Sequence, residues 1–134
     1  MTRVSAALRN AVREQAGRRC EYCRLPERES PYPFHVEHII AIQHDGLTEA
    51  DNLAWACLQC NKAKGPNIAG LDRETGELAR LFDPRRQVWA DHFEIADGEI
   101  IGKTAVGRVT TRLLRFNTAQ RVDLRRELVS AGEW

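Results

Sequence analysis

Four cysteines, arranged as two Cys-x-x-Cys pairs, constrain this 134-residue chain more than any other feature of its sequence. The pairs are Cys20 with Cys23 and Cys57 with Cys60. A two-residue spacing suits a knuckle that wraps around one metal ion, whereas a disulfide across so short a span is strained. Four thiolates form a closed tetrahedral shell without an open position, so the spacing predicts a structural zinc site.

Such a zinc would fasten two distant segments into one small scaffold. Structural zinc in small modules contributes ~10–16 kcal/mol of apparent binding free energy, which is comparable with the stability of a whole domain. The cysteines alone fit an enzyme held in shape by zinc. They fit equally a zinc ribbon that binds DNA or protein without catalysis.

The composition is that of an ordinary globular protein, with 43% hydrophobic and 29% charged residues. The chain has neither a secretory apolar segment nor a stretch of membrane-spanning length, so we expect a cytoplasmic protein with no membrane partner. Thiols in that reducing compartment bind metals more often than they form disulfides. The net charge is only +1, but residues 104–126 hold six arginines and one acid.

The segment between the cysteine pairs reads as strand, loop, strand and helix. Aromatic and β-branched residues predict a strand over 34–40, and Asp45-Gly46 is a turn signal. A second apolar run covers 53–56. A helical pattern begins at about Leu58 and is ended by Gly65-Pro66.

Further elements are expected on both sides of this central unit. A helix over 2–17, capped by Thr2 or Ser5, fills most of an N-terminal segment 2–19. Asp97-Gly98 between apolar residues predicts a hairpin. The other expected features are a proline-rich loop at 24–33, a turn at 72–76, a strand at 78–82, an aromatic packing cluster at Trp89, His92 and Phe93, and helices at 104–117 and 119–130.

No linker divides the chain, so we expect one domain over residues 1–134 with an α+β fold. Its parts would be the N-terminal helix segment, a zinc-stapled core at 20–70, and a C-terminal extension at 71–134 that holds a hairpin and two helices.

Polar residues between and beside the cysteine pairs could hydrolyse a phosphodiester. That reaction requires an activated water and a cation on the scissile phosphate. Histidine is suited to remove a proton near neutral pH, and carboxylate and amide oxygens hold hard divalent cations. Glu37, His38 and Asn61 provide these groups, and the cysteine pairs bring Asn61 towards the first strand.

These residues and their spacing resemble the HNH endonuclease family. The family pattern combines two Cys-x-x-Cys pairs with an acid-His-Ile run, an Asn-Leu pair and an Asn-x-x-Lys-Gly run. Here the runs are Glu37-His38-Ile39-Ile40, Asn52-Leu53 and Asn61 to Gly65, within a match that covers about residues 20–65. Residues 81–85 and 102–108 also resemble extensions found in small bacterial members.

The resemblance implies a ββα-metal (His-Me finger) core and a role for each site residue. His38 would be the general base that activates water. Asn52 would brace the intervening loop and thereby position the base. Asn61 and Glu37 would bind a catalytic Mg²⁺ or Mn²⁺ that is separate from the zinc, with Glu37 at a position where the family more often has aspartate.

The step from Glu37 to His38 sets a geometric condition on this assignment. Adjacent residues on a regular strand point to opposite faces of the sheet. The two side chains can therefore serve one site only if the strand kinks or ends there, or if water links them.

Basic residues near the site and in the tail are candidate contacts to nucleic-acid phosphates. Lys62 and Lys64 follow Asn61 on the expected short helix. Helical spacing lets Arg108, Arg112 and Arg115 share one face. A solvated face with acidic partners explains the arginines equally well.

The sequence thus predicts a metal-dependent endonuclease that hydrolyses DNA phosphodiester bonds, and the resemblance favours double-stranded DNA. The alternative is a non-catalytic zinc module that binds nucleic acid, or an accessory subunit of a larger defence or phage machine. The complete Glu-His, Asn and Asn set favours the enzyme, because a module without catalysis does not need it. The pattern leaves the oligomeric state open.

Overall fold

The computed structural model describes residues 4–134 and divides them between two compact units. The first unit holds the residues up to Ile68 together with Asp83–Arg85, and the second holds Ala69–Phe82 and Arg86–Trp134. The chain therefore leaves the first unit after residue 68 and returns to it for three residues. Whether the two units act as the single predicted domain remains a prediction.

The first unit begins with helix α1 (Ala6–Gln15). The hydroxyl of Ser5, one of the two predicted caps, accepts a hydrogen bond of 3.1 Å from Leu8 N and so satisfies a first-turn N–H group. Thr2, the other predicted cap, lies outside the described residues. Gly17 follows the helix with a φ of +64°, which matches the predicted stop.

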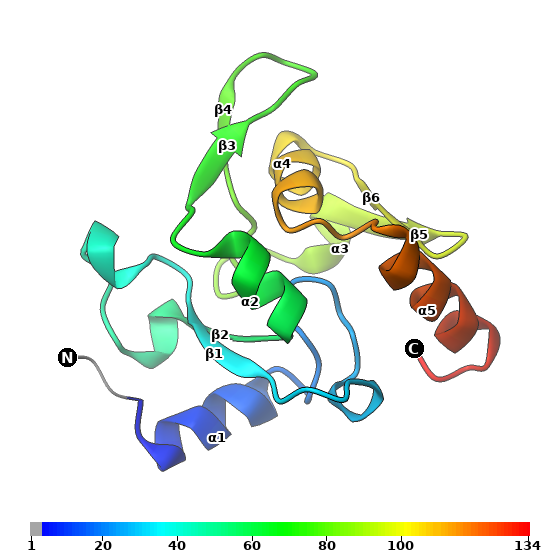
Figure 1. Cartoon of the computed structure of the whole chain (residues 1–134). Helices are drawn as coiled ribbons and strands as arrows, with labels where there is room; N and C mark the ends of the chain where they lie inside the picture. The colour runs from blue at the N-terminus through cyan, green and yellow to red at the C-terminus, as the bar shows by residue number, and fades with distance from the viewer. Residues whose placement is uncertain (1–3) are drawn as a thin grey trace. The chain divides into compact units, whose positions relative to one another are not determined.

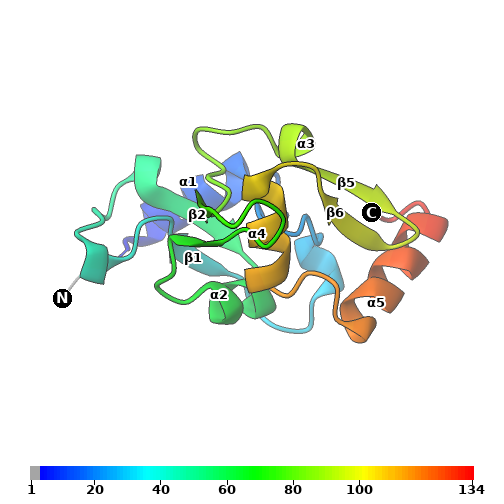
Figure 2. The same ribbon diagram turned by 90° about the horizontal axis from the view of Figure 1, so that it is seen from above.

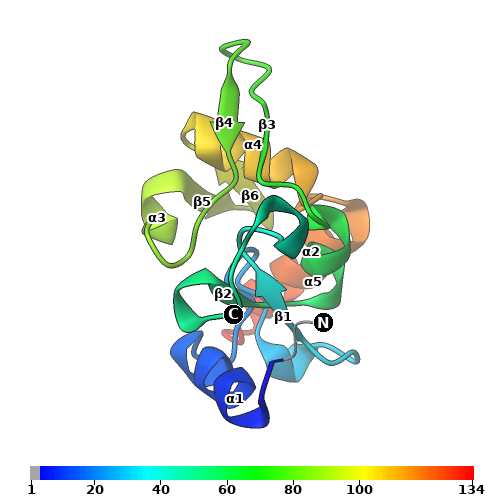
Figure 3. The same ribbon diagram turned by 90° about the vertical axis from the view of Figure 1, so that its left-hand side faces the viewer.

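The central unit has the predicted order of strand, loop, strand and helix. Strands β1 (His35–His38) and β2 (Leu53–Ala56) pair antiparallel, and helix α2 (Leu58–Lys64) follows directly. All four residues of β2 are buried. Helices α1 and α2 lie on opposite sides of this hairpin (Figures 1 and 3), which confirms the α+β, ββα core.

Strand β1 is shorter than the predicted strand over 34–40 because the side chain of Asn52 replaces the strand ladder beyond it. Asn52 Oδ1 accepts a hydrogen bond of 2.8 Å from Ile40 N, and Asn52 Nδ2 donates one of 2.9 Å to Ile40 O. Gly46 lies against the same groups: a Cβ atom there would collide with Ile40 O and lie 2.9 Å from Asn52 Nδ2. The turn at Asp45-Gly46 therefore needs its glycine for close approach.

The second unit contains two hairpins and three helices. Strands β3 (Ala69–Leu71) and β4 (Leu78–Arg80) form the first hairpin, and β5 (Phe93–Ala96) and β6 (Glu99–Gly102) form the second. The helices are α3 (Trp89–His92), α4 (Ala105–Leu113) and α5 (Ala119–Ser130). The second hairpin turns at Asp97 and Gly98, both with positive φ, as predicted. Strand β3 was not predicted.

Helix α4 lies along the β5–β6 hairpin, as Figure 2 shows, and also packs on β3 and β4. A Cβ atom on Gly70 would lie 2.6 Å from Leu113 Cδ1, so glycine allows β3 to approach the helix. The predicted aromatic packing is confirmed: the Phe93 ring lies 4.9 Å from Trp89, 5.4 Å from Phe82 and 5.8 Å from Phe116. Within residues 4–134, no helix has both the length and the apolar character needed to cross a membrane.

Candidate active site

The four cysteines converge on one buried point. Their Sγ atoms all lie within 4.8 Å of one another, and Cys23 Sγ lies 3.7 Å from Cys57 Sγ. Four sulfurs placed tetrahedrally at about 2.3 Å from a zinc ion would be roughly 3.8 Å apart. The donor set and the spacing therefore fit a structural metal such as zinc.

Local backbone structure holds each pair of thiols. Cys23 N donates to Cys20 Sγ and Cys60 N donates to Cys57 Sγ, each at 3.4 Å. Cys57 is also the N-cap of α2, so the second pair begins that helix. Glu21 N donates to the backbone oxygen of Trp55 at 2.8 Å, which ties the first pair to β2.

The thiols need a cation to become ligands. Burial, followed by bonding to the neighbouring thiols, raises the pKa of Cys60 well above its ordinary value. A bound divalent cation reverses this preference, because a coordinated thiol is deprotonated outright. The cluster therefore fits a site whose thiols lose their protons when the ion binds.

A separate cavity of about 330 Å³ is lined by three of the four predicted catalytic residues, and Asn52 is not among its lining residues. Glu37, His38 and Asn61 all line it, along with residues 41–43 and the Gly65-Pro66 turn. Strand β1 ends at His38. The side chains of Glu37 and His38 would point to opposite faces of a continuous strand, but here they lie at its end, and both line the cavity. The first two side chains come from this strand end and the third from α2.

His38 is held by a residue that the sequence pattern did not single out. Its Nε2 atom lies 2.8 Å from the hydroxyl oxygen of Thr48, in the loop between the strands. In the tautomer in which Nε2 carries the proton and donates it to Thr48, Nδ1 is the proton acceptor. Burial, and secondarily the Lys64 ammonium, lower the pKa of His38 below the ordinary value of 6.5.

Asn52 makes three hydrogen bonds to the loop that carries Thr48. Besides the two bonds to Ile40, Asn52 Nδ2 donates to Leu47 O at 2.9 Å. The side chain is buried, so these bonds are shielded from water. This is the geometry of a loop brace next to His38.

Glu37 is buried and forms an ion pair with Lys64. The distance from Lys64 Nζ to Glu37 Oε1 is 2.8 Å, and the two side chains are 1% and 9% exposed. Burial raises the pKa of Glu37, and the ammonium offsets part of that rise. Lys64 was expected to contact phosphate on the surface. The structure does not fit that expectation, because its amine is enclosed.

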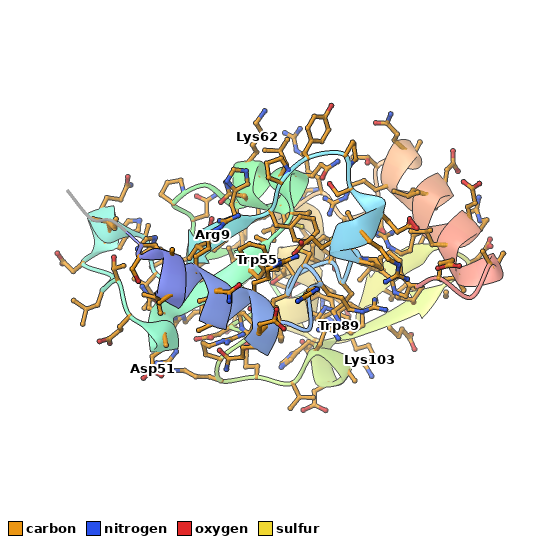
Figure 4. The ribbon with its side chains drawn as sticks, turned by 90° about the horizontal axis from the view of Figure 1, so that it is seen from below. Arg9, Asp51, Trp55, Lys62, Trp89 and Lys103 are labelled. Carbon is orange, nitrogen blue, oxygen red and sulfur yellow. The ribbon has the colours of Figure 1, made fainter. Side chains whose placement is uncertain are left out.

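The remaining predicted phosphate contacts differ in their surroundings. Lys62 is exposed on α2 and projects away from it (Figure 4). In the second unit, Arg108, Arg112 and Arg115 line one cavity of about 620 Å³.

The three arginines do not share one helical face, because Arg115 follows the end of α4 with a φ of +53°. Arg108 forms ion pairs with Asp72 and Glu74. Arg112 donates to the backbone oxygen of Leu71. Arg115 is exposed on the surface.

A larger cavity of about 750 Å³ lies beside α1 and has no catalytic character. The guanidinium of Arg9 lies over the Trp55 ring, 4.7 Å from its centre, and donates to Phe34 O. Figure 4 labels both side chains. Arg13 is paired with Glu27 at 2.7 Å. The charged side chains of this cavity, Arg9, Arg13 and Glu27, therefore all have partners.

A strand hairpin and helix that carry a histidine, a carboxylate and an amide, in the same unit as a four-cysteine cluster, define a ββα-metal domain. The family model for the HNH endonuclease matches residues 20–67, which include all four cysteines, β1, β2 and α2. Residues 20–67 thus match the HNH endonuclease family, and the match supports a nuclease or nucleic-acid-related function that involves a metal. Comparisons with curated proteins and with solved structures gave no significant match.

Proposed function

We propose that this protein is a metal-dependent endonuclease that hydrolyses DNA phosphodiester bonds. The observation that carries the proposal is the single cavity lined by Glu37, His38 and Asn61. A histidine poised as a base and two oxygen donors for a hard cation are the groups that this reaction needs.

His38 acts as the general base. Its bond to Thr48 leaves Nδ1 to take the proton of the attacking water, and its lowered pKa keeps the ring neutral at physiological pH. Asn52 positions this base indirectly, since it fixes the loop through Ile40 and Leu47.

Glu37 and Asn61 fit a catalytic divalent cation. Glu37 Oε2 has no hydrogen bond to any residue in the described part of the chain, and the Asn61 side chain also has none. Both face a cavity, and carboxylate and amide oxygens prefer Mg²⁺ or Mn²⁺ over soft metals. When bound, such an ion stabilises the charge that develops on the phosphate.

Phosphate contacts come from exposed cations. Lys62 is next to Asn61 in sequence and is exposed, and Arg115 is the exposed arginine of the cavity in the second unit. Contacts of this kind bind nucleic acid without reading bases, which suits duplex DNA of any sequence.

The proposal is tested with zinc-loaded protein and supercoiled plasmid. We expect nicked or linear products with added Mg²⁺ or Mn²⁺ and none without. Asn61→Ala should lower the rate at limiting metal at least about tenfold, because it removes a ligand. Plasmid that is bound but never cleaved with either metal would identify a non-catalytic binding module instead.

A further inference from the structure

The most deeply buried charge beside the candidate active site belongs to Lys64. Its side chain is 1% exposed, and its ammonium makes two hydrogen bonds. One goes to Glu37 Oε1 at 2.8 Å and the other to the backbone oxygen of His38 at 3.0 Å. A buried ammonium is costly unless it is paired in this way.

The two hydrogen bonds go to consecutive residues that are both predicted to be catalytic, Glu37 and His38. Lys64 contacts the side chain of Glu37 and the carbonyl of His38, so it anchors the last two residues of β1. Lys64 also lies three residues after Asn61 on α2. Helix α2 thus supplies the Asn61 amide to the cavity and the Lys64 ammonium to the end of β1.

The carboxylate of Glu37 has two oxygens in different surroundings. Oε1 is bonded to the ammonium, whereas Oε2 is without a hydrogen bond to residues 4–134 and belongs to a side chain that lines the cavity. A divalent cation in the cavity and the ammonium of Lys64 would therefore share one carboxylate. Two positive groups on one carboxylate repel each other.

We propose that Lys64 is a positioning residue that serves as an internal counter-cation for Glu37. It neutralises and orients the carboxylate in the metal-free protein, and it lowers the affinity of the same carboxylate for the catalytic metal. The inference rests on the proposed function, because it takes Glu37 as a metal ligand.

Removal of the ammonium should change two properties in opposite directions. Metal affinity should rise, since a cation that repels the metal is lost and a buried carboxylate is left in need of one. The cleavage rate at saturating metal should fall, because the carbonyl of His38 loses its anchor. General damage to the fold would instead lower both the metal affinity and the cleavage rate.

The test measures Mn²⁺ binding by calorimetry to zinc-loaded, DNA-free protein at about pH 8, where protons compete little for carboxylates. Lys64→Met should bind Mn²⁺ about tenfold more tightly than the wild type. The matched control is Lys62→Met, which removes the same charge from the exposed face of α2 and should change the affinity by less than about twofold. Lys64→Gln keeps hydrogen-bond donors at the site and repeats the test if the methionine variant does not fold.

Glu37→Gln separates this inference from the proposed function. If Glu37→Gln binds Mn²⁺ as tightly as the wild type, Glu37 is not a ligand and the metal assignment itself fails. If Glu37→Gln weakens binding but neither Lys64 variant tightens it, the counter-cation role alone is refuted. The expected pattern is tight binding in Lys64→Met that disappears when Glu37→Gln is added.

Discussion

At the scale of single residues, His38 owes its proposed role to neighbours from other segments. Thr48 contacts one ring nitrogen, and Lys64 contacts the His38 carbonyl. Burial lowers the pKa of His38, because an apolar environment disfavours the charged imidazolium, and the Lys64 ammonium lowers it further. The neutral, proton-accepting form is therefore the favoured one.

The pH dependence of cleavage follows from this shift. Only neutral His38 can accept a proton, so kcat/KM should stay at its plateau as the pH falls past the ordinary histidine value of ~6.5. The rate should decline only below the lowered pKa. Initial rates measured between about pH 5 and pH 8 at saturating Mn²⁺ would show this. A decline centred above ~6.5 would contradict the assignment.

The sequence pattern predicted the residues of this candidate site but not all of their partners. His38, Asn52 and Asn61 have a fixed spacing from the cysteines, and spacing is visible in one chain. The bond from Thr48 and the burial of Lys64 depend on how distant segments pack, which no local pattern encodes. Lys64 was therefore given a surface role that its enclosed amine does not fit.

At the scale of elements, the cysteine cluster joins the segment before the ββα core to the start of its helix. Cys57 begins α2, and the segment after Cys20 is tied to β2 through Glu21. The bounds of β2 and α2 could be predicted because an apolar run and Gly65 mark them. Strand β3 could not be predicted, because three residues with a central glycine show no alternation of apolar and polar side chains. The early end of β1 depends on a side chain fourteen residues beyond His38, Asn52 of the loop.

Removal of zinc should dismantle this core. Once the metal is lost, four crowded thiols replace four bound thiolates, and ~10 kcal/mol or more of stabilisation disappears. Protein stripped of zinc by a strong chelator, freed of the chelator and supplied with Mn²⁺ should not cleave plasmid and should have lower helix content in circular dichroism, and added Zn²⁺ should restore both. Cys60→Ser should behave like the chelated protein. Unchanged helix content without zinc would mean that the cluster does not hold the fold.

At the scale of the whole molecule, the chain divides into two units, and residues 83–85 return to the first. Arg85 explains this return. Its guanidinium forms an ion pair with Glu21, between the two cysteines of the first pair, and both side chains are 8% exposed. Glu21 also accepts a hydrogen bond of 2.9 Å from Trp55 N. A segment of the tail thereby completes the packing around the metal cluster.

Arg85→Met should destabilise the first unit by about 3 kcal/mol, because it leaves a buried carboxylate without its cation. Arg80→Met removes an exposed arginine of the same tail and should change the free energy of unfolding by less than about 0.5 kcal/mol. Urea titrations of the zinc-loaded proteins give both values. Equal stability of the two variants would show that residues 83–85 only lie against the core.

The most direct test of the central claim compares plasmid cleavage by the wild type, His38→Ala and His44→Ala at equal zinc content and with Mn²⁺. His44 is an exposed histidine of the loop between the strands and does not line the cavity. We expect His38→Ala to lose at least about 10²-fold in rate while it keeps its fold and its affinity for DNA, since it removes the general base. His44→Ala should cleave as the wild type does. Cleavage by His38→Ala at the wild-type rate would contradict the account.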